Sequence, residues 1–373
     1  MARAGDKSPG GQPGIHGRDI AALCLPATTT FREAIDHIDK HGKGIILITD
    51  TVGVLVGTIT DGDVRRWILL GQSLDTSVAG LLEQKKHSPY PRPVTAPVGS
   101  SSAALLKLMQ DKVLHQIPLV DKHDRVVDLV TMDELLPGQR LPLQAVIMAG
   151  GFGTRLRPLT ADMPKPMLPV GDRPLLELIL RQLQASGIRR VNVTTHYMAE
   201  KIVEHFGNGD KFGVEMNYVA EDKPLGTAGA LGLLENPEET LLVMNGDILT
   251  DVDLRALLSY HQEHEATLTV GVRKYEVKVP YGVIESDGPL VRKIVEKPAL
   301  TFFVNAGIYL LEPRAHGYIP AGQRFDMTDL ISRLIQEKHK VACFPILEYW
   351  LDIGRHVDYD QALQDVKTGR FAA

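Results

Sequence analysis

The C-terminal part of the chain alternates between strand and helix patterns. Short continuous apolar runs at 145–149 and 241–244 are typical of strands buried on both faces of a parallel sheet. Residues 175–183 carry apolar side chains at helical spacing, and residues 191–195 alternate like a strand before a further helix near 198–206. This rhythm predicts an α/β fold with a doubly wound, mostly parallel sheet, whose ligands bind at the carboxyl ends of the strands.

A different pattern fills the first 140 residues, which contain an internal repeat. A shift of 71 positions places residues 44–63 on residues 115–134 without a gap, so that Asp50 falls on Asp121. Each copy predicts a helix, a strand, an Asp-containing turn, a second strand and a Thr-x-x-acid segment that opens another helix. The threonine of that last segment is equally explained as a simple helix cap.

The first predicted strand of the C-terminal part leads into a loop suited to polyphosphate. Gly150, Gly151 and Gly153 follow it, and without Cβ atoms their backbone amides can approach an anion closely. Basic side chains come next, at Arg155, Arg157 and Lys165. The loop is not a dinucleotide fingerprint, because the third glycine would fall on Leu156, and the chain has no Walker A motif. The alternative is a glycine-rich turn with solvated arginines.

Two later segments place polar groups near the same edge of the predicted sheet. The run EDKPLGTAGAL at 221–231 is a turn into a helix, whose glycines allow close approach to a planar or hydroxylated ligand. Its Thr227, taken alone, is equally a helix cap. Asp247 follows the strand at 241–244, where a carboxylate is well placed to hold Mg²⁺, with Asp352 as the second carboxylate. Either aspartate is otherwise a turn former.

The run GGFGTRLRPLT followed by PKPMLP resembles the signature of the sugar-1-phosphate nucleotidylyltransferases, in particular the mannose-1-phosphate guanylyltransferase-like branch. The resemblance covers residues 143–373 and implies a catalytic domain with a Rossmann-like nucleotidyltransferase sheet. It implies an enzyme that couples a sugar 1-phosphate to a nucleoside triphosphate, with GTP favoured, by Mg²⁺-dependent in-line transfer. The products are an NDP-sugar and pyrophosphate. The alternatives are a thymidylyl- or uridylyltransferase acting on glucose 1-phosphate, and a catalytically inactive nucleotide-sensing regulatory protein.

The same resemblance assigns roles to individual residues. Catalysis falls to Arg155, Lys165 and Asp247, and the metal ligands are Asp247 and Asp352. The nucleotide-binding set is Ala149, Gly150, Gly151, Gly153, Thr154, Glu221, Gly226 and Thr227. The sugar-phosphate set, in the segments YG, EKP and NAG, is Gly282, Glu296, Lys297 and Asn305.

The N-terminal repeat resembles a tandem pair of CBS domains, at 15–137 with halves 15–78 and 86–137, after a disordered tail at 1–14. Such pairs often bind adenine nucleotides, and we expect one to regulate the transferase. The resemblance places this ligand at the two Thr-x-x-acid segments, on Thr60, Asp63, Thr131 and Glu134. A docking or dimerisation module without a ligand is the alternative.

Composition narrows the cellular setting. A hydrophobic content of 44%, a charged content of 23% and a net charge of −5 are those of soluble globular proteins and argue against broad nucleic-acid binding. No apolar run approaches 18 residues, and the polar N-terminus has no signal-peptide core. The two cysteines lie in apolar surroundings and suit a reducing compartment. We therefore expect a cytoplasmic homo-oligomer without membrane or nucleic-acid partners.

Overall fold

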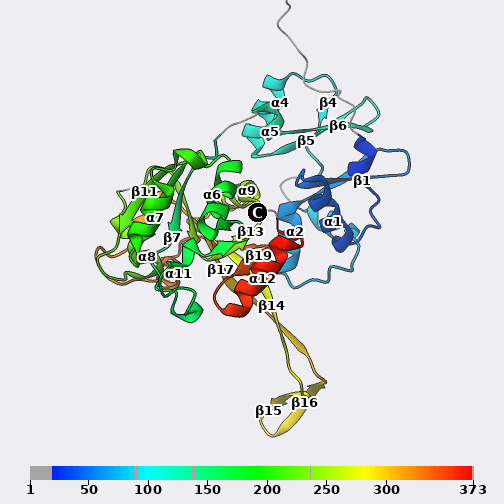
Figure 1. The fold of residues 1–373 in the computed structure, drawn as a ribbon. Coiled ribbons are helices and arrows are strands. Elements are labelled where there is room, and N and C mark those ends of the chain that lie inside the picture. Colours follow the sequence, from blue (N-terminus) through cyan, green and yellow to red (C-terminus); the bar gives the residue numbers. More distant parts are fainter. Residues whose placement is uncertain (1–18, 88–90, 137–139, 236, 372–373) are drawn as a thin grey trace, which may run out of the picture. The chain divides into compact units, whose positions relative to one another are not determined.

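The computed structural model describes residues 19–87, 91–136, 140–235 and 237–371. The predicted disordered tail at 1–14 lies outside the described residues. The chain divides into two compact units, residues 1–139 and residues 140–373 (Figure 1).

The first unit is built from two copies of one short α/β motif. The first copy consists of η1 (Ile20–Leu23), β1 (Cys24–Leu25), α1 (Phe31–His41), β2 (Ile45–Thr49), β3 (Leu55–Thr60), α2 (Asp61–Leu69) and α3 (Ala79–Lys85). The second consists of β4 (Ala96–Pro97), α4 (Ser102–Lys112), β5 (Gln116–Val120), β6 (Val126–Thr131) and α5 (Met132–Leu135). Each copy forms a three-stranded sheet in which the first pair of strands is parallel and the second antiparallel.

Equivalent residues of the two copies make matching hydrogen bonds, which confirms the repeat predicted from the sequence. Asp50 accepts hydrogen bonds from the backbone amides two and four residues ahead, and Asp121 does the same in the second copy. The copies also meet at matching positions, since Val54 forms a β-bridge with Arg125, the residue 71 positions later.

The second unit contains a seven-stranded sheet in the order β11-β10-β7-β12-β17-β14-β18. Its strands are β7 (Leu143–Met148), β10 (Arg190–Thr195), β11 (Glu215–Ala220), β12 (Thr240–Asn245), β14 (Leu268–Lys278), β17 (Ala299–Leu311) and β18 (Val341–Pro345). All neighbouring strands are parallel except β17, which is antiparallel to both β12 and β14. The predicted doubly wound, mostly parallel sheet is confirmed.

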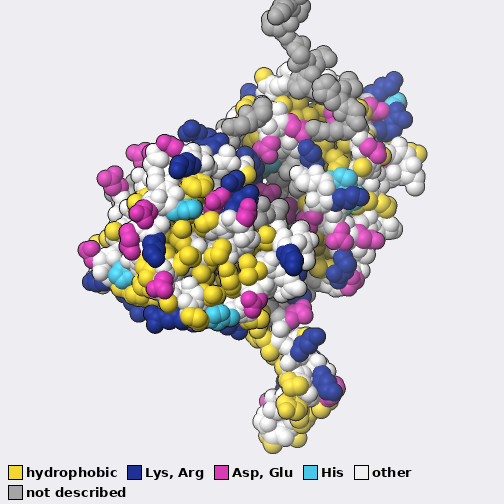
Figure 2. All heavy atoms as spheres, viewed as in Figure 1, with side chains coloured by type: hydrophobic (Ala, Val, Ile, Leu, Met, Phe, Trp, Pro, Cys, Tyr) yellow, Lys and Arg dark blue, Asp and Glu magenta, His cyan; other side chains and the backbone are white. Residues whose placement is uncertain are grey.

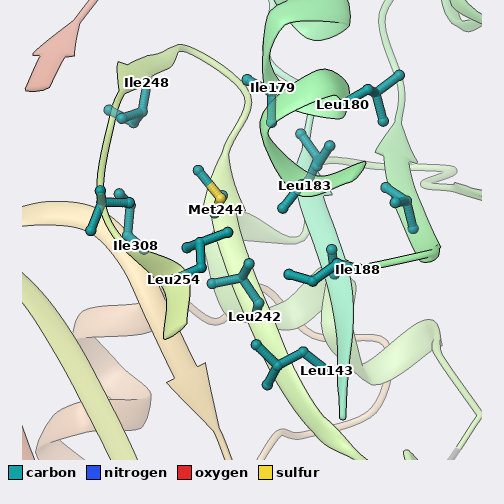
Figure 3. Close-up of a cluster of buried hydrophobic side chains, with 14 of the residues drawn as sticks. Leu143, Ile179, Leu180, Leu183, Ile188, Leu242, Met244, Ile248, Leu254 and Ile308 are labelled. Atoms are coloured by element: carbon teal, nitrogen blue, oxygen red, sulfur yellow. The ribbon is translucent and has the colours of Figure 1, made fainter. Parts of the chain in front are cut away.

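Helices cover both faces of this sheet because neighbouring residues of a strand point to opposite sides. On one face, β7 contributes Ala145 and Ile147 to a core shared with α6 (Leu175–Ala185), α7 (Ala199–Phe206) and α9 (Leu254–Glu263). Figure 3 shows this core, with Leu242 of β12 between Leu254 of α9 and Ile188. On the other face, Val146 packs in a core with α8 (Gly226–Gly229), η5 (Ala230–Leu233), α10 (Pro313–His316) and α11 (Met327–Gln336). Within the described ranges, no helix is both long and apolar enough to span a bilayer.

One segment of the second unit extends beyond its seven-stranded sheet. The outer halves of β14 and β17 form a two-stranded ribbon that ends in the hairpin of β15 (Val283–Asp287) and β16 (Leu290–Val295). We call residues 274–303 the arm. It projects away from the rest of this unit (Figure 1), and nearly all of its residues are exposed.

Candidate functional site

The glycine loop begins where β7 ends, at the carboxyl edge of the sheet. Gly153 has a φ of +61°, and a Cβ there would lie 3.0 Å from Cγ2 of Thr160. The Thr160 hydroxyl donates to the Gly153 carbonyl at 2.7 Å and so fixes the shape of the loop. Gly151 differs, because it is exposed and a Cβ there would meet no atom within 4 Å. One glycine therefore shapes the loop, and the other leaves a surface open to a ligand.

Lys165 and Asp247 form an ion pair beside this loop. Lys165 begins η3 (Lys165–Met167), and its Nζ donates to Oδ2 of Asp247 at 2.5 Å. The lysine side chain is only 12% exposed, so this is not the solvated cation of a surface loop. Asp247 lies two residues beyond β12, whose last residue, Asn245, pairs with Met148 at the end of β7. The register of these two strands therefore places the acid next to the glycine loop.

Asp352 comes to the same place from the far end of the chain. It ends β19 (Trp350–Asp352), which pairs antiparallel with β13 (Ile248–Thr250) so that Asp352 lies opposite Ile248. The Ile353 amide donates to the Asp247 carbonyl at 3.0 Å. Burial raises the pKa of Asp352, and the charge of Asp247 raises it further, while Lys165 and Arg155 oppose the rise.

Arg155 completes the cluster. It lies in η2 (Thr154–Leu156), which starts with Thr154 directly after the glycine loop. A Cβ on Gly354 would lie 3.4 Å from Oδ1 of Asp352 and 3.6 Å from Nη1 of Arg155, so the two side chains converge there. We call Arg155, Lys165, Asp247 and Asp352 the charged cluster: two carboxylates and two cations that the sequence holds up to 197 positions apart.

The charged cluster fits the ligand preference of Mg²⁺. Oδ1 of Asp247 and Oδ1 of Asp352 are buried and have no hydrogen-bond partner. Buried carboxylate oxygens without partners are costly unless a ligand or water satisfies them. Mg²⁺ is usually held by one or two carboxylates together with substrate phosphates. Among the described residues, no group of three or more His, Cys, Asp or Glu side chains is arranged to hold a metal ion.

The second segment predicted to bind nucleotide, residues 221–231, lies next to the glycine loop. Oε2 of Glu221 accepts a hydrogen bond from the Leu225 amide at 3.0 Å. A Cβ on Gly150 would lie 2.7 Å from Oε1 of Glu221, so a larger residue at position 150 would displace this carboxylate. Ala149, the last residue before the loop, is buried and donates its amide to the Thr194 carbonyl of β10 at 3.1 Å.

Thr227 is not the N-cap of its own helix, because it lies inside α8. Its hydroxyl instead accepts a hydrogen bond from the Met327 amide at the start of α11, at 2.9 Å. Gly226 before it has a φ of +80°, and a Cβ there would meet Oδ1 of Asp326 at 2.4 Å. The segment is therefore fixed against the N-terminus of α11.

The four residues assigned to the sugar phosphate are split between two places. Asn305 pairs with Val272 at the root of the arm, and two residues on, Gly307 approaches the side chain of Asn245. Gly282, Glu296 and Lys297 lie on the arm where the ribbon meets the hairpin, and a Cβ on Gly282 would be 3.0 Å from Oε2 of Glu296. Of the four, only Asn305 lies outside the arm, two residues before the Gly307 that approaches Asn245.

Three residues outside the predicted set line the site. Asn245 ends β12, and its Oδ1 is buried without a partner. Phe152 and His196 meet edge to face at 5.4 Å beside the glycine loop, and His196 Nδ1 lies 2.7 Å from the Glu221 carbonyl oxygen. Asn245 directly precedes Gly246-Asp247, so its position was readable from the sequence. His196 follows a strand in the same way, although nothing in its sequence neighbourhood marked it.

The residues assigned to the CBS ligand are engaged within the first unit. Asp63 accepts from the Thr60 amide at 2.9 Å, and the Asp63 amide donates to the Thr60 hydroxyl at 3.2 Å, which is a capping box. Lys85 and Arg66 also pair with Asp63, at 2.5 and 2.7 Å. Burial would raise the pKa of Asp63, but these two cations outweigh it and hold the pKa below its ordinary value.

The second copy of this segment is similar. The Thr131 amide donates to Glu134 at 3.2 Å, and Lys43 of the first copy donates to the other oxygen of Glu134 at 2.8 Å. In both copies the acid thus has a backbone partner and a lysine partner.

Comparison with known proteins finds relatives for both parts of the chain. The nucleotidyl transferase family matches residues 144–369, and the CBS domain matches 18–70 and 89–137. A UTP–glucose-1-phosphate uridylyltransferase from Synechocystis sp. is 35% identical over 60% of this chain and 63% of its own length. A mannose-1-phosphate guanylyltransferase from Mycobacterium tuberculosis is 32% identical over 61% of this chain and 65% of its own length. The chain thus spans less than two thirds of the length of these curated relatives. A solved structure of HddC from Yersinia pseudotuberculosis covers 60% of this chain and 98% of its own, with 26% identity and a TM-score of 0.47.

The two kinds of glycine in the loop predict different defects. We expect Gly153→Ala to lower the stability of the ligand-free protein by about 1 kcal/mol or more, because its φ is positive and a Cβ would crowd Thr160. Gly151→Ala is expected to leave ligand-free stability within about 0.5 kcal/mol of wild type and to weaken nucleotide binding. Thermal unfolding without ligand and calorimetric titration with GTP measure the two effects. Equal nucleotide affinity in Gly151→Ala and wild type would show that the open side of the loop is not used.

Proposed function

Because the chain belongs to the nucleotidyl transferase family, we propose that it couples a sugar 1-phosphate to a nucleoside triphosphate, releasing pyrophosphate and forming an NDP-sugar. The observation that carries this proposal is the charged cluster beside the glycine loop. Two carboxylates with buried, unpartnered oxygens lie next to two cations, at the carboxyl edge of a parallel sheet. Such a site binds polyphosphate and a divalent cation together.

The reaction needs no general base from the protein. The second pKa of a phosphate monoester is about 6, so the attacking phosphate oxygen of the sugar 1-phosphate is already ionised near neutral pH. What the chain must supply is in-line positioning and neutralisation of negative charge. This agrees with a cluster composed of two carboxylates, an arginine and a lysine, without a histidine.

Each member of the cluster then has a distinct task. Arg155, which is exposed and directly follows the glycine loop, stabilises the leaving pyrophosphate. Lys165, held by Asp247, contacts the phosphate oxygens at the reacting centre. Asp247 and Asp352 would hold Mg²⁺, which when bound neutralises phosphate charge. Restraint of Lys165 by the ion pair keeps its ammonium group in place before substrate arrives.

We propose GTP as the favoured triphosphate. Glu221 directs a carboxylate oxygen at the glycine loop, and guanine offers two adjacent N–H donors where uracil and thymine offer one. Relatives named as mannose-1-phosphate guanylyltransferases support the same choice, as in Mycobacterium tuberculosis and Kluyveromyces lactis. The relative named as a uridylyltransferase supports the competing choice, UTP with glucose 1-phosphate.

We further propose that an adenine nucleotide binds the CBS pair and tunes the transferase. The Thr60–Asp63 segment is the expected ribose position, with Arg66 close enough for phosphate. Lys85 already pairs with Asp63, so a ribose must displace that ammonium group or bind beside it. Regulation requires in addition that the ligand favour one state of the protein over another.

A substrate panel tests the transferase proposal. Pyrophosphate release is measured with GTP, ATP, UTP and dTTP against mannose, glucose, glucosamine and heptose 1-phosphates. We expect kcat/KM for the best GTP pair to exceed that of any UTP pair by about 100-fold or more, because a site that hydrogen-bonds its base rejects others strongly. Glu221→Gln should lower the GTP value by about 10- to 100-fold, the weight of a charged hydrogen bond.

Two outcomes would contradict this proposal in different ways. Preference for UTP or dTTP would replace guanylyl with uridylyl or thymidylyl transfer and leave the reaction class intact. Absence of pyrophosphate release with every pair would point to the inactive nucleotide-sensing protein.

A pair of matched capping-box variants tests the CBS ligand. AMP, ADP or ATP at a hundredfold excess over Kd should stabilise the wild-type fold by about 2.7 kcal/mol. Asp63→Asn should abolish the shift, because ribose hydroxyls lose their anionic acceptor. Glu33→Gln alters an equivalent capping box, with Thr30, at the start of α1 and should retain it. Thermal unfolding with each nucleotide measures this, and an unchanged shift in Asp63→Asn would remove the ligand from that segment.

A further inference from the structure

Arg273 lies at the root of the arm, where β14 extends beyond the seven-stranded sheet. The arm begins with the next residue and projects at the bottom of the view in Figure 2, where hydrophobic and basic side chains lie along it. Arg273 pairs with Val304 of β17, so its backbone is held between two long strands. Its half-buried side chain contacts a different segment, residues 346–349, which we call the linker.

The linker joins β18 to β19 and has no regular secondary structure. β18 ends at Pro345, and the Ile346 amide then donates to the Val272 carbonyl of β14 at 2.8 Å. Beyond that point the linker leaves the sheet, so its carbonyl groups need other donors. Nη1 of Arg273 donates to the carbonyl of Ile346 at 2.8 Å and to that of Glu348 at 3.0 Å. One side chain therefore holds the linker at two positions.

These two hydrogen bonds have a charged donor that is partly withdrawn from water. Hydrogen bonds with an ionised donor are roughly twice as strong as neutral ones. Burial lowers the pKa of the Arg273 guanidinium, and the charge of Glu348 opposes that shift. The group still remains ionised, because an arginine does not lose its proton in proteins. Removal of the guanidinium would leave both carbonyl groups without this donor, which costs more in a half-buried place than at an exposed one.

The linker leads directly into β19, whose last residue is Asp352. β13 and β19 have three residues each and pair only as a short two-stranded ladder, which is marginally stable by itself. The position of Asp352 is also costly, since its Oδ1 is buried without a partner and Asp247 brings a like charge to the same cluster. A carboxylate in this position needs an anchor on the segment that carries it.

Two neighbouring contacts hold the same stretch of chain from other sides. The Tyr349 carbonyl accepts hydrogen bonds from the Thr250 hydroxyl at 2.7 Å and the Asp251 amide at 3.0 Å. The Trp350 indole donates to the Ala306 carbonyl of β17 at 2.9 Å. These contacts fix the residues next to β13 and β17, whereas the arginine fixes the preceding residues to β14. The linker is thus held against three strands before it reaches the charged cluster.

We infer that Arg273 is a positioning residue for the proposed transfer reaction: it anchors the linker to β14 and thereby keeps Asp352 beside Asp247 in the charged cluster. The inference rests on the proposed function for the chemical role of Asp352. Arg273 acts through the linker and not on a substrate, so its loss should impair turnover without removing a substrate contact. Residues that orient metal-binding side chains in this way typically contribute about 10- to 100-fold to metal affinity or activity.

Hydrogen exchange of the ligand-free, full-length protein tests the anchor without any turnover. The Ile353 amide, which donates to the Asp247 carbonyl at 3.0 Å, reports whether β19 stays in place. In Arg273→Met we expect its exchange to become about 10-fold faster or more, the weight of a charged hydrogen bond, with β7 and β12 unchanged. Equal exchange of the Ile353 amide in Arg273→Met and wild type would overturn the inference.

Two further variants serve as controls for the exchange measurement. Arg189 is also half-buried and donates to a backbone carbonyl, that of Gly213 at 2.7 Å, but it lies at the amino end of β10. Arg189→Met should therefore leave exchange of the Ile353 amide at the wild-type rate. If Arg273→Met exchanges faster throughout the sheet as well, Arg273→Lys decides, because its ammonium group still donates to a carbonyl. A rise confined to β19 supports the anchor, and a uniform rise or no rise in Arg273→Lys overturns it.

Metal binding and kinetics give a second readout. Mn²⁺ affinity, measured by electron paramagnetic resonance with GTP present, should fall about 10-fold or more in Arg273→Met and stay unchanged in Arg189→Met. For pyrophosphate release, kcat should fall by a similar factor while KM for GTP stays near its wild-type value. Wild-type Mn²⁺ affinity in Arg273→Met, or a raised KM at constant kcat, would overturn the positioning role. If wild type releases no pyrophosphate, the proposed function fails while hydrogen exchange still decides the inference.

Discussion

The register between β7 and β12 is the constraint on which the site depends. Because Asn245 lies opposite Met148, the Asn245-Gly246-Asp247 turn leaves the sheet beside the glycine loop. The resulting 2.5 Å ion pair between Asp247 and Lys165 joins two loops that are separate in sequence. A third segment closes on them because β19 pairs with β13. A shift of one residue between β7 and β12 would turn the apolar side chains of one strand toward the wrong core and separate the acid from the lysine.

The residues proposed for the site are divided between the edge of the seven-stranded sheet and the arm. The charged cluster lies on the ends of strands buried between two helical layers, which is a rigid place for charge stabilisation. The residues proposed for the sugar phosphate, except Asn305, lie on the arm, whose side chains are largely exposed. The proposed nucleotide and sugar sites therefore involve elements of very different local stability.

Sequence patterns predicted the sheet class and the repeat but not the arm. The strands at 145–149, 191–195 and 241–244, the helices at 175–183 and 198–206 and the 71-residue repeat follow from periodicities that local residues encode. Asp247 and the glycine loop were also readable, because both directly follow buried strands. The continuous ladder between β14 and β17 is a long-range pairing, so the sequence did not show that Lys297 lies far from Asn305. Nor did it show that Thr227 binds the start of α11, 100 residues later.

The central claim is that Asp247 and Asp352 hold the divalent cation on which turnover depends. The most direct measurement is a Mg²⁺ titration of pyrophosphate release by Asp247→Asn, with Asp251→Asn as the matched control, since Asp251 lies on the following turn outside the charged cluster. The account predicts that Asp247→Asn lowers kcat by about 100-fold or more, comparable to the loss of one electrostatic contact in other active sites. It predicts a Mg²⁺ response close to wild type for Asp251→Asn. Wild-type Mg²⁺ dependence and turnover in Asp247→Asn would contradict the account.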